Sequence, residues 1–323
     1  MGIILKQKYR DFCKNESSIP IFSRDGWLDA VCSEPGVDWN VILLHKGDNI
    51  IASMPYCIKR RHGLTYITMP KLTQALGPWL RDSQAKYAKA LAHQKALMTD
   101  LIQGLPPFDH FVQNFHYPIS NWLPFYWQGF SQTTRYTYIL EDISNLDRVW
   151  GGFESKIRTD IRKAEKTLTV DSNADIDSFL YLNDMTFARQ GFKTPYSRAL
   201  IKQLDISCQN NGCRKVFIAS DSQNRMHAGV YLVWDHHSAY YLMSGANPEL
   251  RNSGATSLCL WEAIRFASQV CSRFDFEGSM IEPVERFFRG FGARQVPYFQ
   301  INKMSRLMQM IVAVRNLIKP NKI

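Results

Sequence analysis

Two carboxylates in an otherwise apolar segment have the residue types and spacing best suited to catalysis. Asp275 and Glu277 alternate with phenylalanines late in the chain. The alternation predicts a strand over 273–277 whose two carboxylates point to one face. A carboxylate in that position can orient an amine or accept its proton. An ion pair or a cap at the end of a strand accounts for the same residues, so both interpretations stay open.

A basic helix supplies the second group of candidates. Arg158, Arg162 and Lys166 recur at helical spacing, and Lys163 lies beside them. We expect these side chains to share one face, with apolar residues on the other. Arginine offers a bidentate fork to phosphate oxygens, so this face is predicted to hold the pyrophosphate of a substrate. A solvated helix face is the alternative.

Composition and motifs exclude several classes of protein. The 323 residues, 45% of them hydrophobic, suffice for two packed domains. No apolar run has the length of a membrane span and no signal peptide is recognised, so we expect a cytoplasmic protein. The seven cysteines lack paired spacing, which favours free thiols over disulfides or zinc. The eight histidines form no ligand pattern, so no metal is expected, and GxSxG and P-loop motifs are absent.

The order of elements predicts an α/β protein. A hairpin, a helix and a strand come first, and a change of pattern near 144–146 separates them from a second half. That half begins with the basic helix and continues through further helices into an antiparallel meander, after which helices and strands alternate. The predicted ranges are 41–63 for the hairpin, 82–104 for the first helix, 108–115 for the strand, 154–166 for the basic helix, 176–190 for the next helix, 215–244 for the meander, 254–270 and 283–291 for the late helices, and 273–277 and 298–302 for the late strands.

The loop after the meander carries a glycine motif. It consists of Arg251, Asn252, Ser253, Gly254 and Ala255, and Thr256 stands where the motif usually ends on a small residue. With the segments 156–166, 274–278 and 286–293, this loop resembles the FemAB-like branch of the GNAT acyltransferase superfamily. That branch includes the peptidoglycan bridge-forming aminoacyltransferases and the BioF2-like (CelD-like) acetyltransferases of envelope polysaccharide loci.

The resemblance implies both fold and cofactor site. It implies tandem GNAT-like domains, each a mixed sheet flanked by helices, over 1–145 and 146–305. It also implies that residues 251–255 bind the pyrophosphate of coenzyme A at a helix N-terminus.

Transfer of an acyl group from a thioester to an amine implies further roles. The reaction needs a base for the amine and an acid for the departing thiolate. We expect Asp275 or Glu277 to act on the amine and Tyr241 to act as the acid, with core packing as the alternative for Tyr241. Arg286 and Arg289 are expected to bind the acceptor together with the basic helix.

One departure from the family bears on the donor. The bridge-forming enzymes tend to have a lysine in F-K-x-G-F-G, whereas Phe288 stands at that position here. We therefore favour acetyl-CoA or another acyl-CoA as donor and an amine on an anionic or nucleotide-linked sugar precursor of the cell envelope as acceptor. The alternatives are an aminoacyl-tRNA-dependent transferase, with tRNA as a partner, and a non-catalytic module that binds the precursor. No DNA partner is expected.

The tail is predicted to be a basic amphipathic helix over 306–323. It contains four basic residues, no acidic residue and an apolar stripe. Such a helix either contacts the inner face of an anionic membrane or docks on the protein itself, and it is too short to span a bilayer.

Overall fold

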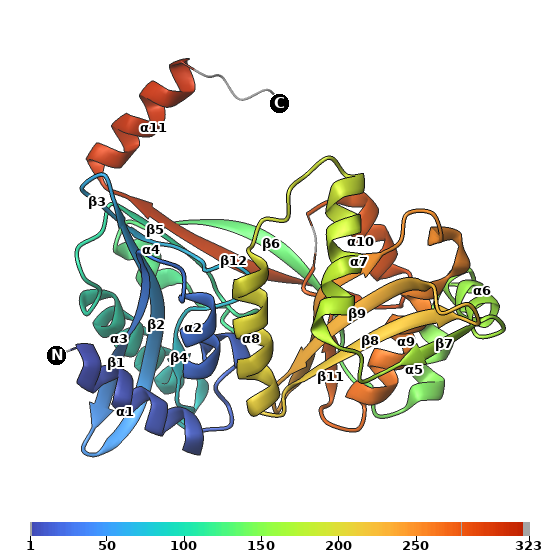
Figure 1. Ribbon diagram of the computed structural model, residues 1–323. Helices are drawn as coiled ribbons and strands as arrows, with labels where there is room; N and C mark the ends of the chain where they lie inside the picture. Colours follow the sequence, from blue (N-terminus) through green and yellow to red (C-terminus); the bar gives the residue numbers. More distant parts are fainter. Residues whose placement is uncertain (1, 279, 319–323) are drawn as a thin grey trace. The chain divides into compact units, whose positions relative to one another are not determined.

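The chain divides into two compact units, as seen in a computed structural model that describes residues 2–278 and 280–318. One unit comprises Met1–Arg135 with Pro297–Ile323, and the other comprises Tyr136–Val296. The predicted boundary at 145 therefore differs from the observed one, and residues 297–305 belong to the first unit. The reason is a long-range pairing, because β12 (Arg294–Met304) returns to β5 (His110–Asn114) of the first unit. Figure 1 labels the elements.

The first unit is built on a mixed sheet. The predicted hairpin is confirmed, and its strands β1 and β2 pair antiparallel. β3 pairs antiparallel with β2 and parallel with β5, which in turn pairs antiparallel with β12. The remaining strand ranges are β1 (Val37–Lys46), β2 (Asn49–Arg61), β3 (Leu64–Ile67), β4 (Trp79–Leu80) and β6 (Ser131–Leu140), of which β6 continues into the second unit.

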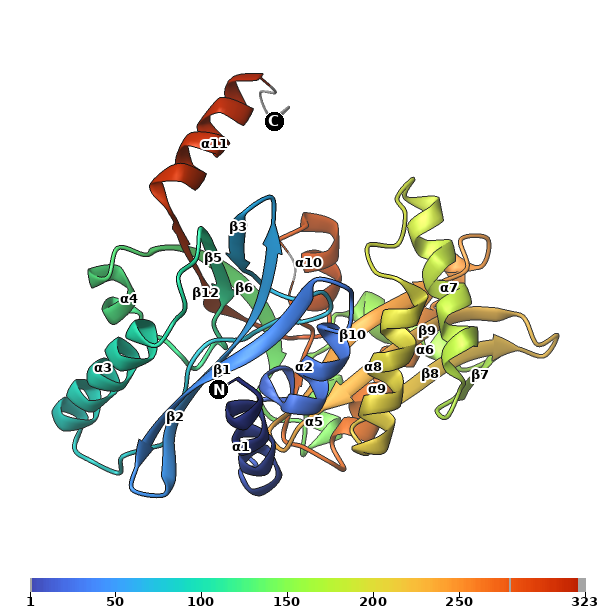
Figure 2. The ribbon, with the colours of Figure 1, turned by 60° about the vertical axis from the view of Figure 1, so that its left-hand side comes forward.

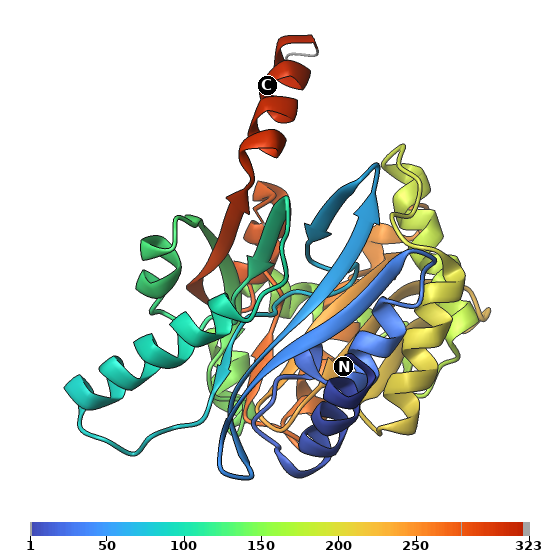
Figure 3. The same ribbon diagram turned by 90° about the vertical axis from the view of Figure 1, so that its left-hand side faces the viewer.

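Helices cover both faces of this sheet. Trp39 of β1 packs against Tyr9 of α1 with ring centroids 6.1 Å apart, whereas Ile42 joins the core beneath α3. Figure 2 and Figure 3 show α1 and α3 on opposite sides of the hairpin. The helices are α1 (Gly2–Asn15), η1 (Ile21–Ser23), α2 (Asp25–Val31), α3 (Tyr87–Gln103), α4 (Leu123–Trp127) and α11 (Arg306–Ile318). Helix α3 begins later than predicted, because the Asp82 carboxylate accepts the backbone N–H of Gln84 and closes a turn there.

The second unit contains the predicted meander. β7, β8, β9 and β10 pair antiparallel in that order, β10 pairs parallel with β11, and β11 pairs antiparallel with the end of β6. The strands are β7 (Leu168–Asp171), β8 (Arg214–Asp221), β9 (Met226–Trp234), β10 (Ser238–Ala246) and β11 (Arg273–Asp275). The helices are α5 (Leu146–Gly152), α6 (Ser155–Ala164), α7 (Ile176–Arg189), α8 (Arg198–Asn210), η2 (Arg251–Ser253), α9 (Ala255–Ala267) and α10 (Glu282–Arg289).

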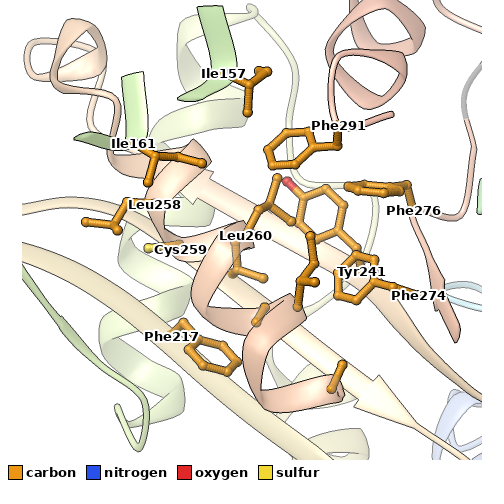
Figure 4. Close-up of a cluster of buried hydrophobic side chains, with 14 of the residues drawn as sticks. Ile157, Ile161, Phe217, Tyr241, Leu258, Cys259, Leu260, Phe274, Phe276 and Phe291 are labelled. Atoms are coloured by element: carbon orange, nitrogen blue, oxygen red, sulfur yellow. The ribbon is translucent and has the colours of Figure 1, made fainter. Parts of the chain in front are cut away.

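The strands of the second unit lie between two helical layers. On one face Phe179 of α7 packs against Tyr231 of β9, with ring centroids 5.7 Å apart. On the other face α6, α9 and α10 enclose a cluster of buried side chains, part of which is drawn in Figure 4. The cluster fixes α9 against the sheet, and α9 in turn fixes the loop in front of it. The expected α/β architecture is confirmed.

Candidate active site

The candidate site lies where β10 and β11 part. The two parallel strands are in register only as far as Tyr240 opposite Asp275, after which β11 ends and β10 continues. A bulge between Tyr241 and Met243 interrupts the pairing of β10 with β9 at the same level. Helix α9 follows β10, so its N-terminus lies beyond the carboxyl ends of these strands. Ligands bind at such ends in open α/β sheets.

Asp275 is a buried carboxylate at this point. Its side chain is only 3% exposed, and its Oδ1 accepts hydrogen bonds from the Thr137 hydroxyl of β6 and from the Glu277 N–H at 2.7 Å. Burial raises the pKa of Asp275 to about 6, with a further increase from the charge of Asp235 and an opposing decrease from the two hydrogen bonds. Asp275 is therefore placed to exchange a proton near neutral pH.

Glu277 lies on a left-handed turn directly after Asp275. Its φ is 58° and that of Gly278 is 63°, and a Cβ on Gly278 would lie 2.1 Å from the carbonyl oxygen of Tyr136. The predicted strand over 273–277 is therefore too long, because the chain turns against β6 at Glu277. Burial raises the pKa of Glu277 well above its ordinary value, and the charge of Asp275 raises it further. A non-glycine residue in this conformation is strained, which is a feature that clusters at active sites.

Tyr241 packs in the hydrophobic core. Its ring meets Phe288 edge to face with centroids 5.8 Å apart, and Figure 4 shows it among Phe274, Phe276 and Phe291. Burial raises the pKa of Tyr241 to about 12. These contacts favour the packing alternative for Tyr241 over the role of thiolate acid.

The glycine motif forms a tight loop in front of α9. Gly254 has a φ of 81°, and a Cβ there would lie 2.3 Å from the backbone oxygen of Asp160 in α6. Glycine is thus required for both the turn and the close packing on α6. As N-cap it has no side chain to occupy the first N–H groups of α9. The Lys163 ammonium donates to the backbone oxygen of Asn252 at 3.0 Å, which brings a cation beside this helix start.

Ser253 adds an unsatisfied polar atom to the same loop. Its hydroxyl oxygen is buried, and within residues 2–278 and 280–318 no hydrogen-bond partner for it is found. Arg251 is exposed at the start of the loop, and Ala255 is buried as the first residue of α9. A buried hydroxyl, a basic flank and free helix N–H groups together fit a phosphate group.

The basic face predicted on α6 is mostly engaged in local contacts. Arg158 donates to the backbone oxygens of Gly151 and Phe153 at the end of α5. The Arg162 guanidinium lies over the ring of Trp150, 5.5 Å from its centroid. Lys166 is exposed. The helix itself is confirmed, and its apolar side is buried as expected.

Helix α10 holds the last two predicted cations. Arg289 forms ion pairs with Glu285 at 3.0 Å and with Glu154 at 3.8 Å, whereas Arg286 is exposed. The Tyr138 hydroxyl donates to Glu285 at 2.8 Å. Phe288, at the position of the family's lysine, is 5% exposed and belongs to the core.

Two β6 residues at this site were not predicted from the sequence. Thr137 and Tyr138 are 138 and 147 residues away from their partners Asp275 and Glu285. They belong to a segment of β-branched and aromatic residues typical of a strand, and this pattern does not indicate a polar contact. Only the pairing of β6 with β11 brings them to the site.

The structure also bears on metal binding. In the part of the chain that the structure describes, no three His, Cys, Asp or Glu side chains form a group that could hold a metal ion.

Comparison with known proteins agrees with this geometry. Residues 152–289 match the model of the acetyltransferase (GNAT) domain family. The second unit contains a GNAT domain. The match includes the Gly254 loop, Asp275 and Glu277, so the prediction of a GNAT acyltransferase is confirmed for the unit that holds the candidate site.

Solved structures are similar over nearly the whole chain. FemX has 14% sequence identity and a TM-score of 0.71, with 95% of this chain and 98% of FemX covered. L-PGS from Bacillus licheniformis has 9% identity and a TM-score of 0.55, with 96% of each chain covered. The C-terminal domain of a proposed lysylphosphatidylglycerol synthetase from Agrobacterium fabrum has 11% identity and a TM-score of 0.55, with 96% of this chain and 95% of that domain covered. The predicted FemAB-like fold is confirmed, and a search of curated proteins finds no match.

Proposed function

We propose that this protein is an N-acyltransferase that moves an acyl group, most simply acetyl, from a coenzyme A thioester to an amine. The observation that carries the proposal is the Gly254 loop, which leaves the start of α9 without a capping side chain beside Lys163. This loop lies inside the GNAT domain match. In this proposal the pyrophosphate binds at residues 251–255, and the thioester lies along the opening between β10 and β11.

Glu277 serves as the base in the proposed reaction, and Asp275 positions it. Glu277 as a whole residue is more exposed than Asp275, while the Oδ1 of Asp275 accepts the backbone N–H of Glu277 and holds the turn. The amine nitrogen attacks the thioester carbonyl and loses a proton to the Glu277 carboxylate. The C–S bond breaks, and the coenzyme A thiolate leaves and takes up a proton from solvent. A general base is most efficient when its pKa lies near the working pH, and burial moves the pKa of Glu277 upward from its ordinary value.

The proposed acceptor is an amine on an anionic or nucleotide-linked sugar precursor of the cell envelope. The exposed cations Arg162, Lys166 and Arg286 of the same unit provide attraction for such a molecule. Arg158 and Arg289 are left out of the acceptor site because their local partners already hold them. We place the reaction in the cytoplasm, where acyl-CoA is formed.

The resemblance to FemAB-like enzymes keeps one rival donor, aminoacyl-tRNA. The net charge of +10 is compatible with a nucleic-acid partner. The buried Phe288 argues against this donor, because the lysine typical of the bridge-forming enzymes is replaced by a core residue.

A donor competition assay tests the proposal. The purified protein is incubated with a panel of amino-sugar nucleotides and either acetyl-CoA or charged tRNA, and the release of free thiol or the loss of the aminoacyl ester is followed. We expect thiol release that depends on the acceptor when acetyl-CoA is the donor, and no loss of the aminoacyl ester when charged tRNA is the donor. Deacylation of tRNA without thiol release would show that the donor is wrong, and no reaction with either donor across the panel would favour the non-catalytic alternative.

A further inference from the structure

The C-terminal helix α11 exposes an apolar face. Five side chains of this face are between 41% and 84% exposed: Leu307, Met310, Ile311, Val314 and Leu317. Their spacing places them along one side of the helix at 3.6 residues per turn. Five large apolar side chains exposed together on one short helix call for a partner that covers them.

The start of α11 is fixed to the sheet of the first unit. The Ser305 N–H donates to the backbone oxygen of Asp109 at 2.8 Å, and the Ser305 hydroxyl donates to the Asp109 carboxylate at 3.0 Å. The same hydroxyl accepts the Met308 N–H at 3.2 Å and so caps the helix. From this anchor beside β5, α11 projects away from β3, β5 and β12 in Figure 1, Figure 2 and Figure 3.

The charges of α11 are all of one sign and border the apolar face. Arg306 and Arg315 fall on its two opposite edges when the helix is viewed along its axis. The helix contains no acidic residue, and the sequence continues with Lys319 and Lys322. Arginines at the borders of an apolar stripe can reach lipid phosphates while the stripe enters the acyl boundary.

We infer that α11 binds an anionic lipid surface and lies in its plane. The complementarity of charge selects this partner over a second copy of the chain, because two such helices would bring four arginines together without a carboxylate on either helix. The inference does not depend on the identity of the acyl donor or acceptor. A single helix of this length binds reversibly, and each arginine contributes roughly a fivefold gain in partition near an anionic surface.

Vesicle flotation of the full-length protein tests the inference. We expect binding to vesicles of phosphatidylcholine with 30% phosphatidylglycerol, and at least tenfold weaker binding to pure phosphatidylcholine. Arg306→Gln/Arg315→Gln should weaken binding to the anionic vesicles roughly 25-fold, the product of two fivefold effects, and added salt should act in the same direction.

Two variants that leave the charge of α11 unchanged test the contribution of the apolar face. Met310→Gln/Val314→Gln should lose at least tenfold in binding, whereas Ala313→Gln, which lies off the five-residue face of the same helix, should bind like the wild type. The melting temperature of all variants should stay unchanged, because the altered side chains are exposed.

Several results would overturn the inference. Equal affinity for neutral and anionic vesicles, or no flotation at all, would contradict it. A dimer of the wild type that dissociates in Met310→Gln/Val314→Gln would assign the face to a second copy. A large fall in melting temperature in that variant would show that α11 docks on its own chain.

Discussion

The basic face of α6 and the two carboxylates that follow β11 were both selected as candidates from residue type, yet their surroundings in the structure differ. On α6, the Arg158 guanidinium is held by backbone carbonyl groups, and the exposed Arg162 guanidinium lies over the ring of Trp150. After β11, burial raises the pKa values of both Asp275 and Glu277, and the charge of Asp275 raises that of Glu277 further. An exposed cation finds local partners at little cost, whereas burial of an ionised carboxylate destabilises the fold, so a catalytic role is a reason to retain it. The carboxylates that follow β11 are therefore the stronger candidates for chemistry.

Substitution of Glu277 should have the largest effect of the changes considered, and this effect should be on catalysis. Glu277→Gln removes the proposed base while leaving the size of the side chain nearly unchanged. We expect kcat to fall about 10²- to 10⁴-fold with little change in donor affinity, the range typical of a lost general base. Glu282→Gln makes the same chemical change at an exposed position of α10 and should be neutral. Wild-type turnover of Glu277→Gln would remove Glu277 from the mechanism.

Asp275→Asn should change stability in a pH-dependent manner. Because its pKa is raised from 3.8 to about 6, the folded state binds this proton more tightly than the unfolded chain. The wild type should therefore lose stability as the pH rises from about 4 to 6, by about 3 kcal/mol at 1.4 kcal/mol per unit. Asparagine carries no charge and keeps an acceptor for the Glu277 N–H. Urea unfolding should show Asp275→Asn to be more stable than the wild type at pH 7 and equal to it near pH 4.

The same variant sharpens the assignment of the base. Removing the charge of Asp275 lowers the pKa of Glu277, so the acid limb of the pH–rate profile should move to lower pH. Asp147→Asn, an exposed carboxylate at the start of α5, should shift neither stability by more than about 1 kcal/mol nor the profile. If the acid limb of the pH–rate profile does not move in Asp275→Asn, the charge of Asp275 does not influence the catalytic base, and the proposed coupling of the two carboxyl groups is wrong.

Arg158→Ala tests the other side of the comparison, since Arg158 acts as a structural residue. Its guanidinium ties the end of α5 to α6 through charged hydrogen bonds, so we expect a loss of about 2 kcal/mol in unfolding free energy and an unchanged KM for donor and acceptor. Lys156→Ala on the same helix breaks only the exposed pair with Asp160 and should cost less than about 0.5 kcal/mol. A raised KM with normal stability would restore Arg158 to the substrate site.

Lys163→Ala should produce the smallest effect. Lys163 borders the Gly254 loop and is exposed, so its loss should weaken acyl-CoA binding roughly fivefold, or about 1 kcal/mol, with the melting temperature nearly unchanged. Lys166→Ala removes the same charge from an exposed position directly after α6. Equal losses in the two variants would indicate general electrostatic attraction and contradict a specific contact. Calorimetric titration distinguishes the two outcomes.

Local patterns predicted the framework of the molecule well. The β1–β2 hairpin, the meander and the helices α6, α7, α9 and α10 follow from periodicity, and the Gly254 loop follows from its glycine. The long-range pairings could not be predicted this way. Nothing local shows that β12 returns to β5 or that Thr137 meets Asp275, because such contacts depend on the order of strands in the sheet.

The chemistry of the site was predictable only in part. Residue type identified Asp275 and Glu277, but their raised pKa values result from burial that the assembled second unit creates. The left-handed turn at Glu277 was hidden because alternation with phenylalanines predicts a continuing strand. The hydrogen bonds from Arg158 to the carbonyl groups at the end of α5 could not be predicted either, because helical spacing is the same whether a cation has a local partner or is free.

The most direct test of acyl-CoA binding at the Gly254 loop is a calorimetric titration of the purified protein with acetyl-CoA, accompanied by a thermal-shift measurement. A ligand that binds only the folded state raises its apparent stability. We predict saturable binding at one site per chain, a rise in melting temperature and a loss of affinity in Lys163→Ala but not in Lys166→Ala. No heat and no thermal shift at millimolar acetyl-CoA would contradict acyl-CoA binding at the Gly254 loop.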